Sequence, residues 1–213
     1  MRVGIVSDSH GRLPVRAREL LLGCALIFHA GDVGSLSLYE DLLGIAPVKA
    51  VRGNADGEDL SFLPVSLTDK AGPFSVCMAH KKKDLPEDYL SYDLVITGHT
   101  HRYRMEQKGS CTLLNPGSMT VKRAGSPLSL ALAEIGPLGL VITQVEYEDE
   151  ALPLEGEERR VVEKIMAMTR QNASISTISQ RLHIPSAYVE KVVRLILTHP
   201  GVDIEGVLRR MGL

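Results

Sequence analysis

The chain has 213 residues, of which 44% are hydrophobic and 23% are charged, and its formal net charge at pH 7 is −2. This composition is typical of a folded globular protein and excludes an intrinsically disordered chain. The nearly balanced charge excludes a global basic surface, so contact with nucleic acid or with an anionic membrane would need a local patch.

The chain contains three cysteines, and each lies within an apolar run: Cys24, Cys77 and Cys111. This placement is typical of small buried side chains in a reducing compartment rather than of a disulfide framework. No apolar stretch approaches the ~18 residues that a membrane span needs, and the first residues show a strand pattern rather than a signal peptide. The sequence therefore predicts a cytoplasmic protein with no membrane partner.

The first part of the chain alternates short β-rich runs with helical patterns. Helices are expected at residues 13–22 and 36–43, and Gly44 closes the second one. Compact runs of apolar and β-branched residues predict strands at 3–7, 25–30, 48–51, 74–79, 94–97, 111–114, 128–133 and 140–146. This order predicts a layered α/β domain whose helices lie outside the sheet.

The pattern changes after residue 147. Residues 148–156 are acidic, contain Pro153 and Gly156 and show no periodicity, so we expect a linker there. From residue 157 onward apolar residues recur at helical spacing, and Pro185 and Pro200 fall where helices would begin or end. We therefore predict an α/β domain at 1–147, a linker at 148–156 and a small all-α domain of about four helices at 157–213.

Polar side chains follow five of the predicted strands, at the point where each strand ends. A carboxylate, an amide or an imidazole stands at every one of these ends. Because ligands bind at the carboxyl ends of strands in open α/β sheets, we expect these side chains to converge on one edge. The seven candidate metal ligands are Asp8, His10, Asp32, Asn54, His80, His99 and His101.

Oxygen and nitrogen donors in this mixture suit borderline divalent ions such as manganese, iron, cobalt, nickel or zinc. Seven ligands are too many for one four-coordinate ion, so we expect two ions that share the central carboxylate of Asp32. Gly31, Gly53 and Gly98 stand beside the ligands, where they permit sharp turns and a close approach of the backbone. One such pair alone is more often a turn, but five strand ends in order favour a metal site.

The ordered motifs resemble those of the calcineurin-like metallophosphoesterases, and most of all their small bacterial and archaeal phosphodiesterase branch. The matching segments are DSH at 8–10, GD at 31–32, GN at 53–54, His80, GHTH at 98–101 and NPGS at 115–118. The resemblance covers about residues 1–147 and implies a four-layer αββα sandwich with a dinuclear metal centre at the sheet edge. It implies two ligand sets: Asp8, His10, Asp32 and His101 for one ion, and Asp32, Asn54, His80 and His99 for the other.

The resemblance implies a phosphodiesterase or phosphatase that acts on small phosphoesters with two divalent metal ions, manganese first and iron, cobalt, nickel or zinc as alternatives. A pair of such ions lowers the pKa of a shared hydroxide, which attacks phosphorus without a covalent protein intermediate. We assign Asp32, Asn54 and His99 as catalytic residues. Two alternatives stay open: a catalytically silent scaffold, like the eukaryotic retromer subunit that shares this fold and lacks several ligands, and a DNA-associated nuclease or regulator.

Two departures from the family pattern bear on the chemistry. Ala55 stands where many relatives carry a histidine that protonates the leaving group, so we expect good leaving groups or another proton donor. The lysines at 81–83 follow the ligand His80, and they either clamp a phosphorylated substrate or form a solvated loop. The resemblance also assigns Asp56 to orienting a histidine, and His29 either supports the ligands or packs within its strand.

Residues 174–189 resemble a helix-turn-helix, a motif whose second helix enters the major groove of DNA. The exposed face expected for that helix carries Lys191 and Arg194 but also Glu190, and the tail as a whole is only slightly basic. We therefore expect a helical cap on the enzyme or a means of pairing protomers into a homo-oligomer, with nucleic-acid binding as the alternative.

Overall fold

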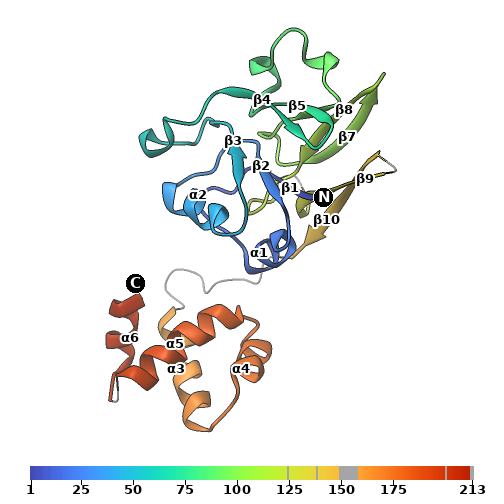
Figure 1. Ribbon diagram of the computed structural model, residues 1–213. Coiled ribbons are helices and arrows are strands. Elements are labelled where there is room, and N and C mark those ends of the chain that lie inside the picture. Colours follow the sequence, from blue (N-terminus) through green and yellow to red (C-terminus); the bar gives the residue numbers. More distant parts are fainter. Residues whose placement is uncertain (124, 138, 149–157, 200, 212–213) are drawn as a thin grey trace. The chain divides into compact units, whose positions relative to one another are not determined.

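The computed structural model describes residues 1–123, 125–137, 139–148, 158–199 and 201–211 (Figure 1). Contacts divide the chain into two compact units, Met1–Asp149 and Glu150–Leu213. Except for Glu148, the predicted linker at 148–156 lies outside the described residues. Each unit has an apolar core of its own.

The N-terminal unit contains two five-stranded sheets. The first has the order β10-β9-β1-β2-β3, with the bounds β1 (Arg2–Val6), β2 (Leu26–His29), β3 (Val48–Ala50), β9 (Leu128–Gly136) and β10 (Gly139–Tyr147). The second has the order β4-β5-β6-β8-β7, with the bounds β4 (Ser66–Ala71), β5 (Phe74–Ala79), β6 (Leu94–Ile96), β7 (Tyr103–Lys108) and β8 (Cys111–Pro116). Strands β1, β2 and β3 run parallel, as do β5, β6 and β8, so the carboxyl ends within each set lie at a common edge.

The sequence patterns predict neither β4 nor β7. Both are edge strands, and most of their side chains are partly or fully exposed. A strand at the edge of a sheet tolerates charged and polar side chains, so it shows no apolar run. Only their pairing with β5 and β8 makes these segments strands.

The two sheets pack face to face around one apolar core. Side chains of β1 alternate between its two faces: Val3 and Ile5 lie in this core, whereas Val6 lies in a second core on the other face. The helices α1 (Val15–Leu21) and α2 (Leu36–Leu43) bury Leu21, Leu38 and Leu42 in that second core. The predicted α/β fold of two packed sheets is therefore confirmed, with these α-helices outside the first sheet.

The outer face of the second sheet is covered in another way. Within the described N-terminal unit no α-helix packs there, and the covering segment carries two short 3₁₀ helices, η2 (Lys82–Asp84) and η3 (Tyr89–Ser91). Leu85 and Tyr89 of this segment pack against a small cluster that contains Val95 and two of the cysteines. All three cysteines are buried and free, as predicted.

The described part of the C-terminal unit has four helices: α3 (Glu158–Arg170), α4 (Ile175–Leu182), α5 (Ser186–Thr198) and α6 (Ile204–Met211). Each contributes to one apolar core, with Val162, Ile178, Val189 and Val207 fully buried. The predicted helical tail is therefore confirmed. None of the described helices has both the length and the apolar character that crossing a membrane requires.

Candidate metal centre

The loops that carry the predicted ligands share an uncommon backbone conformation. Five of these residues have a positive φ in the left-handed region: Asp8 (52°), His10 (46°), Asp32 (54°), His99 (70°) and His101 (58°). A residue with a Cβ atom pays roughly 1–2 kcal/mol to adopt it. The other described non-glycine residues with positive φ are Asn172 and His183, which follow α3 and α4. Among the described non-glycine residues of the N-terminal unit, backbone strain of this kind is therefore confined to predicted ligands.

Two of the predicted glycines let these loops approach one another. Gly31 has a φ of +86°, and a Cβ atom added there would lie 2.7 Å from the ring of His80. A Cβ atom on Gly53 would collide with the backbone nitrogen of Asp32. The backbone N–H of His10 donates to the Asp32 carbonyl at 3.0 Å, which ties the loops after β1 and β2 together. Ligands from separate strands thus reach one place.

Asp8, His10 and His101 form the first donor group, in which one ligand atom of each lies within 4.8 Å of the others. Nε2 of His101 lies 3.1 Å from Asp8 Oδ1 and 3.4 Å from Nε2 of His10. The other ring nitrogen of His101, Nδ1, donates to the Val121 carbonyl at 3.2 Å. This bond leaves Nε2 as the acceptor that faces the group, which is the usual arrangement of a metal-binding histidine.

Asp8 also belongs to a second donor group, with Asp32 and His80. Nε2 of His80 lies 3.4 Å from Asp32 Oδ2, and its Nδ1 donates to the Ala30 carbonyl at 2.8 Å. The backbone N–H of Ala55 donates to Asp32 Oδ1 at 2.8 Å. The residue common to both groups is Asp8, whereas the sequence predicts Asp32 as the shared ligand.

The two remaining predicted ligands lie at the border of these groups. The ring of His99 is half-buried, and its centroid lies 5.2 Å from that of the His80 ring. Its backbone N–H donates to Asp8 Oδ2 at 3.0 Å. Asn54 follows β3 and is exposed. Asp8 and His80 are at most 2% exposed, so the predicted ligands that solvent reaches are Asn54 and the half-buried His10 and His99.

Burial and hydrogen bonds set the two carboxylates apart. Burial raises the pKa of Asp8 above its ordinary value, although the hydroxyl of Ser7 acts in the opposite direction. Burial acts on Asp32 in the same sense, but it is outweighed by His80 and by the N–H of Ala55, which hold the pKa of Asp32 at about 2. The negatively charged form is therefore stabilised less strongly in Asp8 than in Asp32.

The unsatisfied atoms of this centre fit a divalent cation. Asp8 Oδ1 and His80 Nε2 are buried without a hydrogen-bond partner. Such an atom costs about 1–3 kcal/mol unless something else binds it. Burial also lowers the pKa of His101, which favours the neutral imidazole that metals bind. Carboxylates and imidazoles are accepted by manganese, iron, cobalt, nickel and zinc, so the residues present fit the predicted ions.

Small polar side chains hold the ligand loops in place. Ser7 Oγ donates to Asp8 Oδ2 at 2.7 Å, and Ser118 Oγ donates to the Asp8 carbonyl at 2.8 Å. Asn115 Nδ2 donates to the Gly98 carbonyl at 2.7 Å. The roles of these two serines are not among the predictions from the sequence. Their position next to a predicted ligand, or within the NPGS turn, is the signal that could have identified them.

His29 and Asp56 support the loops from outside the donor groups. His29 is fully buried, its Nε2 lies 2.7 Å from Ser9 Oγ, and burial lowers its pKa to about 3. Asp56 accepts hydrogen bonds from the backbone N–H groups of Gly34 and Gly53, at 2.7 Å each. The expectation that Asp56 orients a histidine is therefore wrong. Its carboxylate joins the loops after β2 and β3 because it supplies the acceptors for their N–H groups.

The sequence is similar to those of known metallophosphoesterases. Residues 1–136 match the family model described as "Calcineurin-like phosphoesterase superfamily domain". The chain is 32% identical over 148 residues to a "Probable metallophosphoesterase" from Methanothermobacter thermautotrophicus, a match that covers 62% of this chain and 85% of that protein. It is 28% identical over 173 residues to "Phosphodiesterase YfcE" from Escherichia coli K12, which covers 66% of this chain and 91% of that protein.

The solved structures share the fold. One of them, described as "Structural and Functional Characterization of a Novel Archaeal Phosphodiesterase", matches with a TM-score of 0.57 and 22% sequence identity. The match covers 69% of this chain and 100% of that chain. At this identity the likeness establishes the two-sheet architecture.

Proposed function

The chain belongs to the calcineurin-like phosphoesterase superfamily, and from this premise we propose that it is a phosphodiesterase that works with two divalent metal ions. One observation carries the proposal: five of the predicted ligands meet in two overlapping donor groups. Within these groups Asp8 Oδ1 and His80 Nε2 are buried without a hydrogen bond. The likeness to a named phosphodiesterase supports the choice of a diester substrate.

We assign the ions to the two ligand sets of the family: Asp8, His10, Asp32 and His101 for one, and Asp32, Asn54, His80 and His99 for the other. Manganese is the first candidate. When bound, such ions supply Lewis-acid activation of water and neutralise charge on the phosphate oxygens. The carbonyls of Ala30 and Val121 hold the rings of His80 and His101 through Nδ1, so Nε2 of each ring keeps its direction.

The substrate phosphate approaches from the side of Asn54 and His99 in this proposal, because Asn54 is exposed and His99 is half-buried. The amide of Asn54 can donate a hydrogen bond to a phosphate oxygen. A donor placed there stabilises negative charge as it develops in the transition state. Asp32, whose pKa is held at about 2, stays ionised throughout the working pH range.

The methyl side chain of Ala55 cannot donate a proton to the leaving group, and its N–H is used by Asp32. An alcohol with a high pKa leaves slowly unless it is protonated in the transition state. We therefore expect aryl phosphodiesters to be hydrolysed much faster than alkyl phosphodiesters.

The test is hydrolysis of bis(p-nitrophenyl) phosphate by the full chain after removal of metal with EDTA and after reconstitution. We expect no turnover without metal, restored turnover with manganese, and two ions per chain by mass spectrometry of the metals. The monoester p-nitrophenyl phosphate serves as the comparison substrate and should react more slowly. A chain that binds no divalent ion in calorimetry and hydrolyses neither ester would favour the silent scaffold.

We propose DNA binding by the C-terminal unit as a second candidate function. Helix α4 ends at Leu182 and α5 begins at Ser186, and His183 between them has a φ of 52°. Two short helices joined by so tight a turn support the predicted helix-turn-helix. On α5 Lys191 is exposed, but the neighbouring Glu190 is exposed as well, so the basic character is weak.

A gel-shift titration of the full chain against duplex DNA tests this candidate at two salt concentrations. Binding through a basic face should weaken as salt rises, and Lys191→Glu should weaken it further. Lys122→Glu, an exchange of an exposed lysine in the N-terminal unit, is the matched control. If the wild-type chain does not shift the duplex even at low salt, the tail has a structural role.

A further inference from the structure

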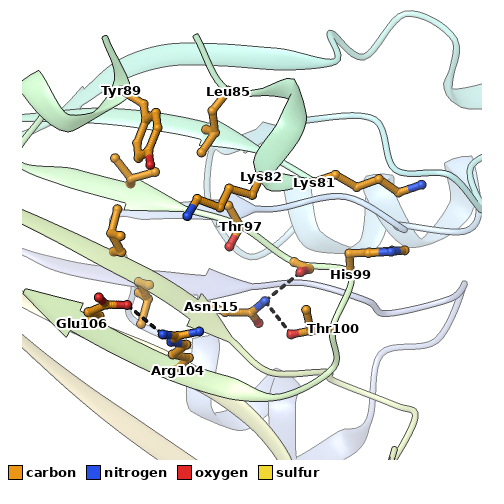
Figure 2. A pocket seen from close by; sticks show the side chains of 14 residues that line it. Lys81, Lys82, Leu85, Tyr89, Thr97, His99, Thr100, Arg104, Glu106 and Asn115 are labelled. Atoms are coloured by element: carbon orange, nitrogen blue, oxygen red, sulfur yellow. Dashed lines mark hydrogen bonds and ion pairs between the residues drawn. The ribbon is translucent and has the colours of Figure 1, made fainter. Parts of the chain in front are cut away.

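A cavity of about 280 Å³ opens on the outer face of the second sheet, beside His99 (Figure 2). Its walls are largely apolar: Leu85 and Tyr89 come from the covering segment, and Val95 and Leu113 come from β6 and β8. The volume is near the lower end of the range for ligand pockets, roughly 300–1,000 Å³, which suits a group of one or two rings.

His99 joins this cavity to the proposed metal centre. The residue lines the cavity, and the centroid of its ring lies 5.2 Å from that of the His80 ring. Asn115 fixes the wall between them, because its Nδ2 donates to the Gly98 carbonyl at 2.7 Å and to Thr100 Oγ1 at 3.1 Å (Figure 2). A phosphate held next to His99 can therefore extend an ester group into the cavity.

The charges at the cavity favour a phosphate at its His99 end. Lys81 is half-buried and Lys82 is exposed, and both line the cavity. In Figure 2 the side chain of Lys82 lies across the cavity, whereas that of Lys81 extends to the side on which His99 lies. On the opposite wall Arg104 and Glu106 form an ion pair at 2.9 Å and so neutralise each other. The positive charge that remains comes from the two lysines.

On the basis of the proposed phosphodiesterase function, we propose that this cavity binds one ester group of the substrate and that this group is an aromatic ring. The side chains of Leu85 and Leu113 supply apolar surface, and Tyr89 supplies an aromatic partner. The ammonium group of Lys82 can lie over the ring in a cation–π contact. The substrate class is therefore an aryl phosphodiester whose phosphate lies next to His99.

Other ester groups fit these walls less well. The hydroxyls of a sugar would lose their hydrogen bonds to water against Val95 and Leu113. A methyl or ethyl group would leave most of the space unfilled. An aryl group also suits the lack of a proton donor at Ala55, because an aryloxide leaves as a weak base.

The test uses two phosphonates that differ only in the group on phosphorus, phenylphosphonate and methylphosphonate. Each is titrated by calorimetry into the manganese-loaded full chain, so the affinity is measured without turnover. We expect phenylphosphonate to bind about 10- to 100-fold more tightly, because burying a phenyl ring removes on the order of 100 Å² of apolar surface from water. Hydrolysis of bis(p-nitrophenyl) phosphate is measured on the same preparation.

Variants of the cavity wall separate the pocket from the metal centre. Leu113→Trp fills the space, and we expect the phenyl preference to fall to within about twofold while methylphosphonate still binds. Tyr89→Ala removes one wall without crowding the sheet and should lower the preference several-fold. Met105→Trp is the matched control: this residue lies on the neighbouring strand β7, is 51% exposed and does not line the cavity. Both affinities should stay unchanged in the control.

The outcomes distinguish the two proposals. Equal affinity of the wild-type chain for both phosphonates, with hydrolysis of the diester intact, would overturn the pocket and leave the proposed function standing. A phenyl preference that both wall variants retain would also overturn the pocket. If neither phosphonate binds the manganese-loaded chain and the diester is not hydrolysed, both the pocket and the proposed function are overturned.

Discussion

The left-handed backbone conformation occurs in both units of this chain, but it does different things in each. In the C-terminal unit Asn172 and His183 adopt it just after α3 and α4, where it ends a helix, and both side chains are exposed. In the N-terminal unit it occurs in the loops of the predicted ligands, and Asp8 and His101 are at most 2% exposed. In this chain, left-handed backbone conformation therefore indicates a metal site only where it directs potential metal ligands toward the protein interior.

The two units also differ in what they bury. Every buried polar residue in the described part of the chain belongs to the N-terminal unit, and the core of the helical unit is apolar apart from the buried hydroxyl of Tyr188. Burying polar groups is unfavourable unless partners bind them, and Asp8 Oδ1 and His80 Nε2 have no hydrogen bond. The N-terminal unit thus buries potential metal ligands, whereas the helical unit buries mainly the apolar faces of its helices.

Removal of a buried metal ligand should have the largest effect on the N-terminal unit. Asp32→Ala should lose both ions and reduce kcat/KM for the aryl diester by on the order of 10³-fold, because both proposed ligand sets use this carboxylate. Metal content and hydrolysis with added manganese are the measurements. Asp41→Ala, which removes an exposed carboxylate of α2, is the control. Wild-type turnover of Asp32→Ala in added manganese would disprove the shared role.

Two glycines that both have a positive φ can each be replaced by alanine and compared. A Cβ atom on Gly31 would lie 2.7 Å from the His80 ring, whereas one on Gly109 would meet nothing within 4 Å. Gly109→Ala should lose about 1 kcal/mol of unfolding free energy through its backbone conformation and bind manganese normally. Gly31→Ala should lose roughly 2–4 kcal/mol and bind manganese at least tenfold more weakly. Urea unfolding and calorimetry measure both, and equal effects would contradict the close approach of the loops.

The buried His29 makes stability depend on pH. Burial lowers its pKa from 6.5 to about 3, so between these values the unfolded chain binds a proton that the folded chain does not. The contribution of His29 is therefore complete above pH 6.5 and is lost as the pH falls toward 3. The metal-free protein should lose roughly 1.5 kcal/mol from pH 6.5 to 5 through this group.

Urea unfolding at several pH values measures this loss. His29→Gln should flatten the slope of unfolding free energy against pH, since glutamine does not titrate. The exposed His199 is the control, and His199→Gln should keep the slope of the wild-type protein. A slope that survives in His29→Gln would mean that other groups cause it.

Replacing His183, at the end of a helix, should have the smallest effect, and it can be compared with the same replacement in a ligand loop. His183→Gly relieves the left-handed conformation after α4 and should stabilise the chain by about 0.5–1 kcal/mol with manganese binding unchanged. His101→Gly relieves the same conformation but removes a proposed ligand, so manganese binding should fall sharply. Thermal unfolding and metal titration of the two variants give the comparison. Loss of stability in His183→Gly would contradict the role assigned to this residue.

Local patterns were enough to find the main parts of the fold and of the candidate centre. The ligand candidates follow apolar runs, and parallel strands of one sheet bring their carboxyl ends together, so Asp8 and Asp32 could be expected at one edge. His80 follows β5 of the second sheet, and only the packing of the two sheets places it beside them. The helices of the tail follow from the spacing of their apolar residues. Edge strands β4 and β7 could not be found this way because their polar side chains face solvent.

The amino-acid sequence by itself determined which residues could act as ligands and that a helical tail follows the α/β domain, because those signals lie in neighbouring residues. Tertiary structure alone decided that Asp8 is common to both donor groups, that Asp56 binds two loops rather than a histidine, and that a cavity lies beside His99. The reason is distance along the chain. The bond from Ser118 Oγ to the Asp8 carbonyl joins residues 110 positions apart, and only the folded chain brings such groups together.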